Sequence, residues 1–188
     1  MIQNNILALL RQHPLIPVVT INNLEEIDPI IGELIKKNIH CIEVTLRTNI
    51  AYEAIAEIKK RFGDIISVGV GTIVKEEQIK KVSEIGVDFI VCPGISENLA
   101  KTLISSGIPF IPGVSTPSEI ILGMQFGWNT FKFFPANLFG GLPALKTYGQ
   151  VFPEITFCPT GGINEKTFNE YLSLKNVISV GGSWMISK

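Results

Sequence analysis

Residues 41–70, CIEVTLRTNIAYEAIAEIKKRFGDIISVGV, contain the unit that decides the fold. A short apolar run at 41–46 is followed by an amphipathic stretch at 49–61 and by a second apolar run at 65–70. Continuous apolar runs on both sides of a helical stretch are typical of parallel strands covered by helices. This part of the chain therefore predicts a β-strand, an α-helix and a second, parallel strand.

The same alternation extends in both directions along the chain. Amphipathic stretches separate the apolar runs, and an additional helix at 2–12 ends before His13-Pro14, because the residue before proline disfavours helical geometry. Eight strands favour a closed (β/α)₈ TIM barrel over an open sheet, and 188 residues suit one domain, 1–188. The eight predicted strands are 16–21, 41–46, 65–70, 89–92, 109–111, 130–134, 155–158 and 177–180.

Polar residues and turn formers gather where these strands end. Active sites of (β/α)₈ barrels are built from the loops that follow the strands. Seven of the eight predicted strands have such a cluster, which places a functional site at this end of the barrel. The clusters are 45–48, 71–72, 92–94, 112–113, 134–135, 159–162 and 181–183.

Composition excludes several classes of protein. Apolar residues make up 46% of the chain and charged residues 18%, with a net charge of −1 and no basic block, so we expect no nucleic-acid partner. No apolar run reaches the roughly 18 residues that span a bilayer, and the N-terminus does not resemble a signal peptide. Three cysteines without CxxC spacing and two histidines predict neither disulfides nor a metal centre, but buried thiols in the cytoplasm.

The segment at 130–135, TFKFFP, contains a lysine inside an aromatic strand. Three of the 16 basic residues are arginines, which leaves 13 lysines, and only Lys132 has such surroundings. Side chains alternate across a strand, so Phe131 and Phe133 would face the helices and Lys132 the barrel interior. Poor solvation there favours the neutral amine, which attacks carbonyl carbons. The alternative is a lysine that pairs with a buried carboxylate for structural reasons.

Glu43, Thr45 and Arg47 occupy every second position of their strand and would share one face. If that face is the interior, Glu43 can carry the protons that Schiff-base chemistry moves. The planar fork of Arg47 suits a substrate carboxylate. An ion pair of Glu43 with Lys132 or with Arg47, formed only for stability, is the alternative.

Two glycine clusters follow the last two predicted strands. Thr160-Gly161-Gly162 and Gly181-Gly182-Ser183 can expose backbone N–H groups that cradle a phosphate, and these are the usual phosphate loops of such barrels. Ordinary turn formation explains either cluster taken alone.

Six segments together resemble the 2-keto-3-deoxy-6-phosphogluconate (KDPG) aldolase family, which also cleaves 4-hydroxy-2-oxoglutarate (KHG). The resemblance covers nearly the whole chain. The segments are 43–48, 70–72, 111–117, 131–135, 157–162 and 181–184.

The resemblance implies a role for each candidate residue. Lys132 would form the Schiff base and Glu43 would be the general acid and base. The remaining residues would bind substrate: Arg47 and Thr72 at the pyruvoyl carboxylate, Pro93 and Phe134 as pocket walls, Thr160, Gly161 and Gly162 along the channel, and Gly181, Gly182 and Ser183 at the phosphate.

The resemblance also implies the biological setting. It implies a metal-free and cofactor-free cytoplasmic homotrimer that yields pyruvate and glyceraldehyde 3-phosphate in the Entner–Doudoroff pathway of carbohydrate metabolism. Its substrate would be a small 2-keto acid. The C-terminal helix of the family is expected to be missing or truncated here, since the sequence ends at Lys188.

Three other readings of the same residues stay open at this point. The main substrate could be KHG, which has no phosphate. The chain could be a phosphate-binding isomerase or synthase barrel in which Lys132 only binds charge. It could also be a binding barrel without catalytic activity.

Overall fold

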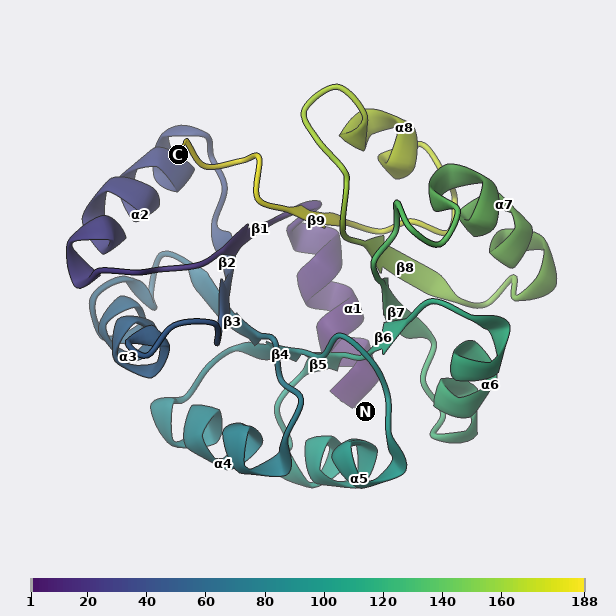
Figure 1. Ribbon diagram of the computed structural model, residues 1–188, viewed down its shortest axis with the longest axis horizontal. Coiled ribbons are helices and arrows are strands. Elements are labelled where there is room, and N and C mark those ends of the chain that lie inside the picture. The colour runs from purple at the N-terminus through teal and green to yellow at the C-terminus, as the bar shows by residue number, and fades with distance from the viewer. Residues whose placement is uncertain (1, 188) are drawn as a thin grey trace.

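Strands and helices alternate along the chain and form a ring of helices around parallel strands (Figure 1). The computed structural model describes residues 2–187. The strands are β1 (Leu15–Val19), β2 (Cys41–Thr45), β3 (Ser67–Gly71), β4 (Phe89–Val91), β5 (Phe110–Ile111), β6 (Gly113–Val114), β7 (Thr130–Phe133), β8 (Thr156–Pro159) and β9 (Val180–Gly182). The helices are α1 (Ile2–Gln12), α2 (Ile27–Lys36), α3 (Ala51–Phe62), α4 (Glu76–Ile85), α5 (Glu97–Ser106), α6 (Pro117–Gln125), α7 (Gly141–Val151) and α8 (Phe168–Leu172), with a 3₁₀ turn η1 (Leu24–Glu26).

Local sequence explains where several helices begin and end. The Ser96 side chain accepts a hydrogen bond from the Leu99 N–H at the start of α5, and Thr116 and Glu119 form a reciprocal capping box at the start of α6. Helices α4 and α5 end at Gly86 and Gly107, which both adopt the left-handed conformation that favours glycine.

The prediction of a closed eight-stranded barrel is wrong. All strand pairs are parallel, but they form two sheets, one of six strands in the order β5-β4-β3-β2-β1-β9 and one of three strands in the order β6-β7-β8. One break lies at Pro112, which has no N–H to donate. It separates β5, which pairs with β4, from β6, which pairs with β7.

The second break lies between β8 and β9. Residues 177–179, expected as part of the last strand, make only an isolated bridge between Val177 and Phe157. The Val180 N–H then donates to the Pro14 carbonyl, and β9 pairs with β1. The chain passes from β8 to β1 within a few residues, so it forms a continuous ladder with β1 and only isolated bridges with β8.

Apolar side chains fill both sides of the strands. One cluster lies inside the ring, where Ile6 and Leu10 of α1 contact inward-facing residues such as Cys41 and Cys158. The other cluster lies between strands and helices and includes Phe131 and Phe133, as the alternation predicted. The interior of the ring is therefore filled with side chains where α1 packs against the strands.

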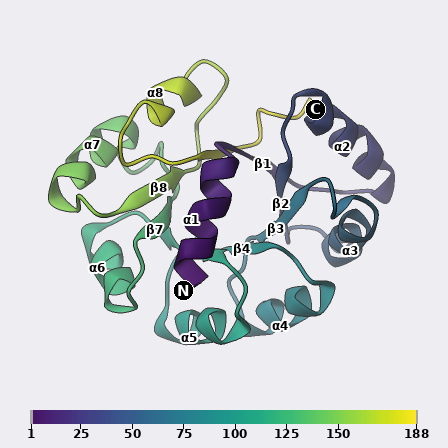
Figure 2. The same ribbon diagram turned by 180° about the vertical axis from the view of Figure 1, so that it is seen from behind.

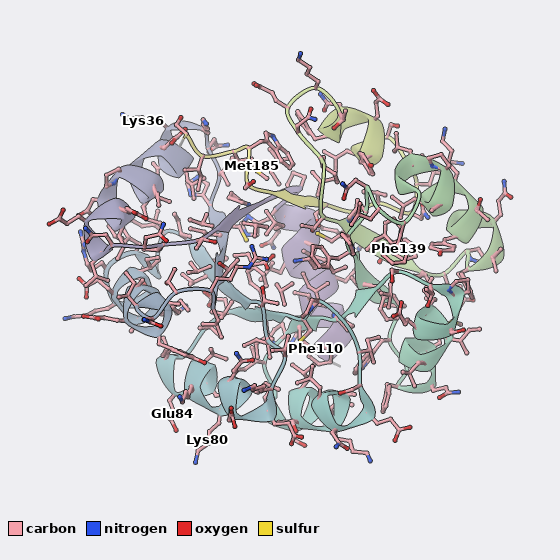
Figure 3. The ribbon with its side chains drawn as sticks, viewed as in Figure 1. Lys36, Lys80, Glu84, Phe110, Phe139 and Met185 are labelled. Atoms are coloured by element: carbon pink, nitrogen blue, oxygen red, sulfur yellow. The ribbon has the colours of Figure 1, made fainter. Side chains whose placement is uncertain are left out.

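Helix α1 covers the end of the ring where the strands begin. It precedes β1 directly and crosses in front of the strands when the molecule is seen from behind (Figure 2). This agrees with the predicted N-terminal helix. No helix follows β9 within the described residues, and the last of them, which include Met185, run beside α2 (Figure 3). There the Lys37 Nζ donates to the Met185 carbonyl.

Many charged side chains lie on the outer surface of the ring. Lys80 and Glu84 of α4 point away from the strands, whereas Phe110 of β5 is buried inside the ring of helices (Figure 3). Among the described helices, none is long and apolar enough to cross a membrane.

Candidate active site

Lys132 and Glu43 form a buried pair inside the ring. The Lys132 ammonium Nζ lies 3.2 Å from Oε1 and 3.3 Å from Oε2 of Glu43. Only 6% of Lys132 and 3% of Glu43 are exposed, and no other charged side chain of the described residues is buried. Strand alternation turns Lys132 inward from β7 and Glu43 inward from β2. The arrangement brings a primary amine and a carboxylate within proton-transfer distance in a site with little solvent.

Neighbouring side chains make this site apolar. The Phe134 ring lies 5.2 Å from Lys132 Nζ, measured to the ring centroid. Burial raises the pKa of Cys92 to about 12 and that of Cys158, the strand partner of Lys132, to about 11. Both thiols therefore stay protonated and uncharged near neutral pH, so they do not compete with Glu43 for the ammonium.

Arg47 and Thr45 are placed differently from one another. Strand β2 ends at Thr45, which is fully buried on the same face as Glu43. Arg47 lies beyond the strand end, is exposed, and forms no salt bridge with any described residue. Its guanidinium is therefore available to an anionic ligand.

A cavity of about 940 Å³ opens at the ends of the strands. Seven of the predicted site residues line it: Arg47, Phe134, Thr160, Gly161, Gly162, Gly182 and Ser183. Lys132 and Glu43 are not in its lining. Phe134 connects the cavity to the buried pair, because its ring forms part of the cavity wall and contacts the Lys132 amine. The amine–carboxylate pair thus lies one side chain away from the cavity.

Three predicted site residues, Thr72, Pro93 and Gly181, lie outside the lining of the cavity. Thr72 follows Gly71, the neighbour of the Glu43 carboxylate, and the Pro93 carbonyl packs against Gly113, the strand partner of Lys132. Both are therefore placed beside the strands that carry the buried pair rather than on the cavity wall.

The two glycine clusters meet at the cavity. An isolated bridge joins Thr160 to Gly181. Gly161 and Gly162 have φ angles of 106° and 71°, a backbone conformation that favours glycine. The backbone N–H groups of Gly161, Gly162 and Ser183 donate to no other described residue. These are unused donors on one cavity wall.

The loop after β1 also lines the cavity, although none of its residues was predicted to belong to the site. Thr20, Asn22, Asn23, Glu25 and Glu26 all belong to the lining. The signal was present in the sequence, since two consecutive asparagines follow the first predicted strand as polar clusters follow the other seven. No group of three or more possible metal ligands occurs among residues 2–187.

Comparison with known proteins identifies similar sequences and structures. A sequence profile described as "KDPG and KHG aldolase" matches residues 6–188. The KHG/KDPG aldolase of Escherichia coli K12 is 41% identical over 179 residues, which cover 95% of this chain and 84% of that protein. The 2-dehydro-3-deoxy-phosphogluconate aldolase of Dickeya dadantii is 44% identical over 173 residues, which cover 92% and 81% of the two chains.

The solved structures include one with a reaction intermediate. The KDPG aldolase of Legionella pneumophila, with pyruvate captured as a covalent carbinolamine, matches with a TM-score of 0.92 and 44% identity over 95% of this chain and 86% of that one. The Zymomonas mobilis ZM4 enzyme with 3-phosphoglycerate matches with a TM-score of 0.92 and 37% identity over 97% and 86%.

Proposed function

This chain belongs to the KDPG and KHG aldolase family, and we propose that it is a class I pyruvate aldolase, a lyase that cleaves KDPG to pyruvate and glyceraldehyde 3-phosphate. The observation that carries this proposal is the buried contact of Lys132 Nζ with both carboxylate oxygens of Glu43. The carbinolamine of the Legionella relative is the adduct that an amine forms with the ketone of pyruvate.

The first half of the reaction forms the Schiff base. Glu43 accepts a proton from Lys132, and the neutral amine attacks the C2 carbonyl of the substrate to give a carbinolamine. Glu43 then donates a proton to the departing hydroxyl, water leaves, and a protonated imine remains. Because both carboxylate oxygens lie within 3.3 Å of Nζ, one residue can serve both proton transfers.

The second half breaks the carbon–carbon bond. The Glu43 carboxylate removes the proton of the C4 hydroxyl, the electrons of the C3–C4 bond flow into the imine, and glyceraldehyde 3-phosphate leaves. The resulting enamine takes up a proton at C3. Water then hydrolyses the imine, releases pyruvate and restores the Lys132 amine.

The remaining site residues bind the substrate in this proposal. Arg47, with Thr72, takes the carboxylate next to C2, because the Arg47 fork forms no ion pair among the described residues. Pro93 and Phe134 form walls, and Thr160, Gly161 and Gly162 line the channel. Gly181, Gly182 and Ser183 hold the phosphate, a role that the unused N–H groups of Gly161, Gly162 and Ser183 support.

A second substrate, KHG, would react by the same steps. The name of the Escherichia coli relative includes both substrates, and this supports the second reaction as an alternative activity of the same site. KHG carries no phosphate, so the glycine loops would contribute nothing specific to its binding.

We also propose how the protein occurs in the cell. Residues 1–188 act as one domain, in a homotrimer, in the cytoplasm, within the Entner–Doudoroff pathway. Exposed apolar side chains on and near α6 and α7 support self-association; they are Ile121, Met124, Leu138 and Phe139. Three unpaired cysteines, Cys41, Cys92 and Cys158, support a reducing compartment.

Borohydride trapping tests the proposed function. Pyruvate and borohydride should add a stable mass to the wild type, and peptide mapping should place it on Lys132. The Lys132→Ala variant should gain no mass and should have no aldolase activity. Lys166→Ala, which removes an exposed lysine after β8, is the matched control and should be trapped normally. An equal adduct on Lys132→Ala would reject the assignment.

A further inference from the structure

Two threonine hydroxyls form a hydrogen-bonded pair at the cavity. Thr20 Oγ1 lies 2.8 Å from Thr45 Oγ1, and either hydroxyl can be the donor. Thr45 is fully buried, whereas Thr20 is partly exposed and belongs to the cavity lining. The pair thus has one residue at the cavity and the other buried behind it.

The strand register fixes where this pair lies. Val19 of β1 pairs with Val44 of β2, which puts Thr20 beside Thr45, two residues beyond Glu43 on the same face. On its other side, β1 pairs with β9, with Pro17 opposite Gly182. Thr20 therefore lies between the strand that carries Glu43 and the strand that leads to Ser183.

The hydrogen-bond inventory leaves one donor in the pair unused. Each hydroxyl has one hydrogen and two lone pairs, so a bond between two hydroxyls uses a single hydrogen. The hydrogen of the accepting hydroxyl stays free. When Thr45 donates, the free hydrogen is that of Thr20. The two hydroxyl oxygens also keep lone pairs that can accept a hydrogen bond. A valine at either position has nearly the same shape and would fill the same space without any hydroxyl.

We propose that the Thr20–Thr45 pair binds the substrate hydroxyl that lies between the cleaved bond and the phosphate. In KDPG the C4 hydroxyl reacts, and the C5 hydroxyl is the one that does not. With C2 at Lys132 and the phosphate at Ser183, C5 lies along the wall that contains Thr20. The pair is then a specificity determinant for an aldehyde with a hydroxyl next to its carbonyl. This inference rests on the proposed aldolase function.

The test uses the synthetic direction, in which pyruvate adds to an aldehyde. Glyceraldehyde 3-phosphate is compared with 3-hydroxypropanal phosphate, which lacks only the hydroxyl in question. The wild type should prefer the hydroxylated aldehyde in kcat/KM by roughly five- to tenfold, the size expected for one hydrogen bond between uncharged groups. The Thr20→Val/Thr45→Val double variant should lose this preference, and Thr20→Ser should keep it.

The double variant is chosen to separate recognition from folding. Thr20→Val alone would leave the buried Thr45 hydroxyl without its partner, whereas replacing both leaves no unpaired group. The matched control is Thr130→Val/Thr156→Val, which removes another threonine pair, with its oxygens 3.2 Å apart, from positions outside the cavity lining. This control should keep the preference for the hydroxylated aldehyde.

Two results would overturn the inference. One is a wild type with equal kcat/KM for the two aldehydes, a measurement that needs no variant. The other is a double variant that keeps the preference. Imine trapping with pyruvate alone involves no aldehyde, so its failure in the wild type rejects the aldolase function, while a trapped imine without aldehyde preference rejects only the role of the threonine pair.

Discussion

A Cβ atom at Gly71 would lie 2.2 Å from Oε1 of Glu43, so the carboxylate occupies the space that any side chain at Gly71 would need. The same holds two residues earlier, where a Cβ at Gly69 would lie 2.1 Å from the Phe89 ring. Both glycines belong to β3 and are separated by one residue, so they lie on the same face of the strand. Strand β3 thus leaves room inside the ring for the Glu43 carboxylate and the Phe89 ring.

Gly71→Ala should displace the Glu43 carboxylate from Lys132. We expect kcat to fall by about 100-fold, the lower end of the contribution of a positioned acid–base group. Steady-state cleavage of KDPG measures it. Gly32→Ala is the control, because nothing lies within 4 Å of a Cβ there, and in the middle of α2 alanine should raise the free energy of unfolding by about 0.5–1 kcal/mol. Equal activity of the two variants would contradict the role of Gly71.

Lys132→Met should destabilise the fold as well as abolish activity. It leaves the Glu43 carboxylate buried without its counter-ion, which typically costs about 3–5 kcal/mol. Adding Glu43→Gln should recover much of that loss, since the double variant contains no buried charge. Urea denaturation gives the free energies of unfolding. Lys75→Met, in an exposed pair with Glu77, should change stability by at most about 1 kcal/mol.

Arg47→Lys should weaken binding of the 2-keto acid while leaving the Schiff-base lysine intact. The ammonium keeps the charge but loses the two parallel N–H donors that match a carboxylate. We expect the pyruvate concentration for half-maximal imine trapping to rise about tenfold, the effect of about 1.4 kcal/mol. Arg61→Lys, on the outer side of α3 and paired with Asp28 and Glu57, should trap pyruvate like the wild type. An unchanged concentration for Arg47→Lys would remove Arg47 from the carboxylate site.

Ser183→Ala should separate the two candidate substrates. If Ser183 contacts the phosphate, kcat/KM for KDPG should fall by roughly tenfold, as for a hydrogen bond to a charged group, while kcat/KM for KHG stays the same. Ser105→Ala on α5 serves as the control, because its hydroxyl donates only to the Lys101 carbonyl. Equal losses for both substrates would argue against a phosphate contact.

The cysteines should be inert in the native protein. Burial raises the pKa of all three thiols, to about 12 for Cys92 and about 11 for Cys158, so almost no thiolate exists at pH 8. A thiol reagent such as iodoacetamide should modify none of them before unfolding and all three in denaturant, which mass spectrometry can count. Rapid labelling of Cys41 in the native state would show that the interior of the ring is open.

The inward direction of Lys132 was easier to predict from sequence than the strand pairing. An amine inside an aromatic strand is unusual by itself, and strand alternation is a local rule, so the inward direction of Lys132 followed from five residues. Whether the strands close into a barrel depends on hydrogen bonds between segments that are far apart in the sequence. Pro112 ends one pairing and starts another, and residues 177–179 bridge β8 while β9 pairs with β1. Neither event has a local signature beyond the proline itself.

The direction of the Arg47 side chain could not be predicted from local sequence either. Its spacing from Glu43 predicted a shared inward face, but β2 ends at Thr45, and past that residue the alternation no longer fixes direction. The loop after β1 was missed although Asn22 and Asn23 mark it in the sequence as a polar cluster at a strand end. That Thr20 to Glu26 line the same cavity as the glycine loops depends on the packing of β1 between β2 and β9.

The amino-acid sequence alone determined the alternation of strands and helices, the inward lysine and carboxylate, and the glycine loops, because each depends on residue types at short spacing. The tertiary structure decided which strands pair, that the amine and the carboxylate from strands 89 residues apart come within 3.2 Å, and that Thr20 joins Thr45 at the cavity. These contacts depend on how distant segments pack, and the free energy of that packing is a property of the whole chain rather than of any one segment.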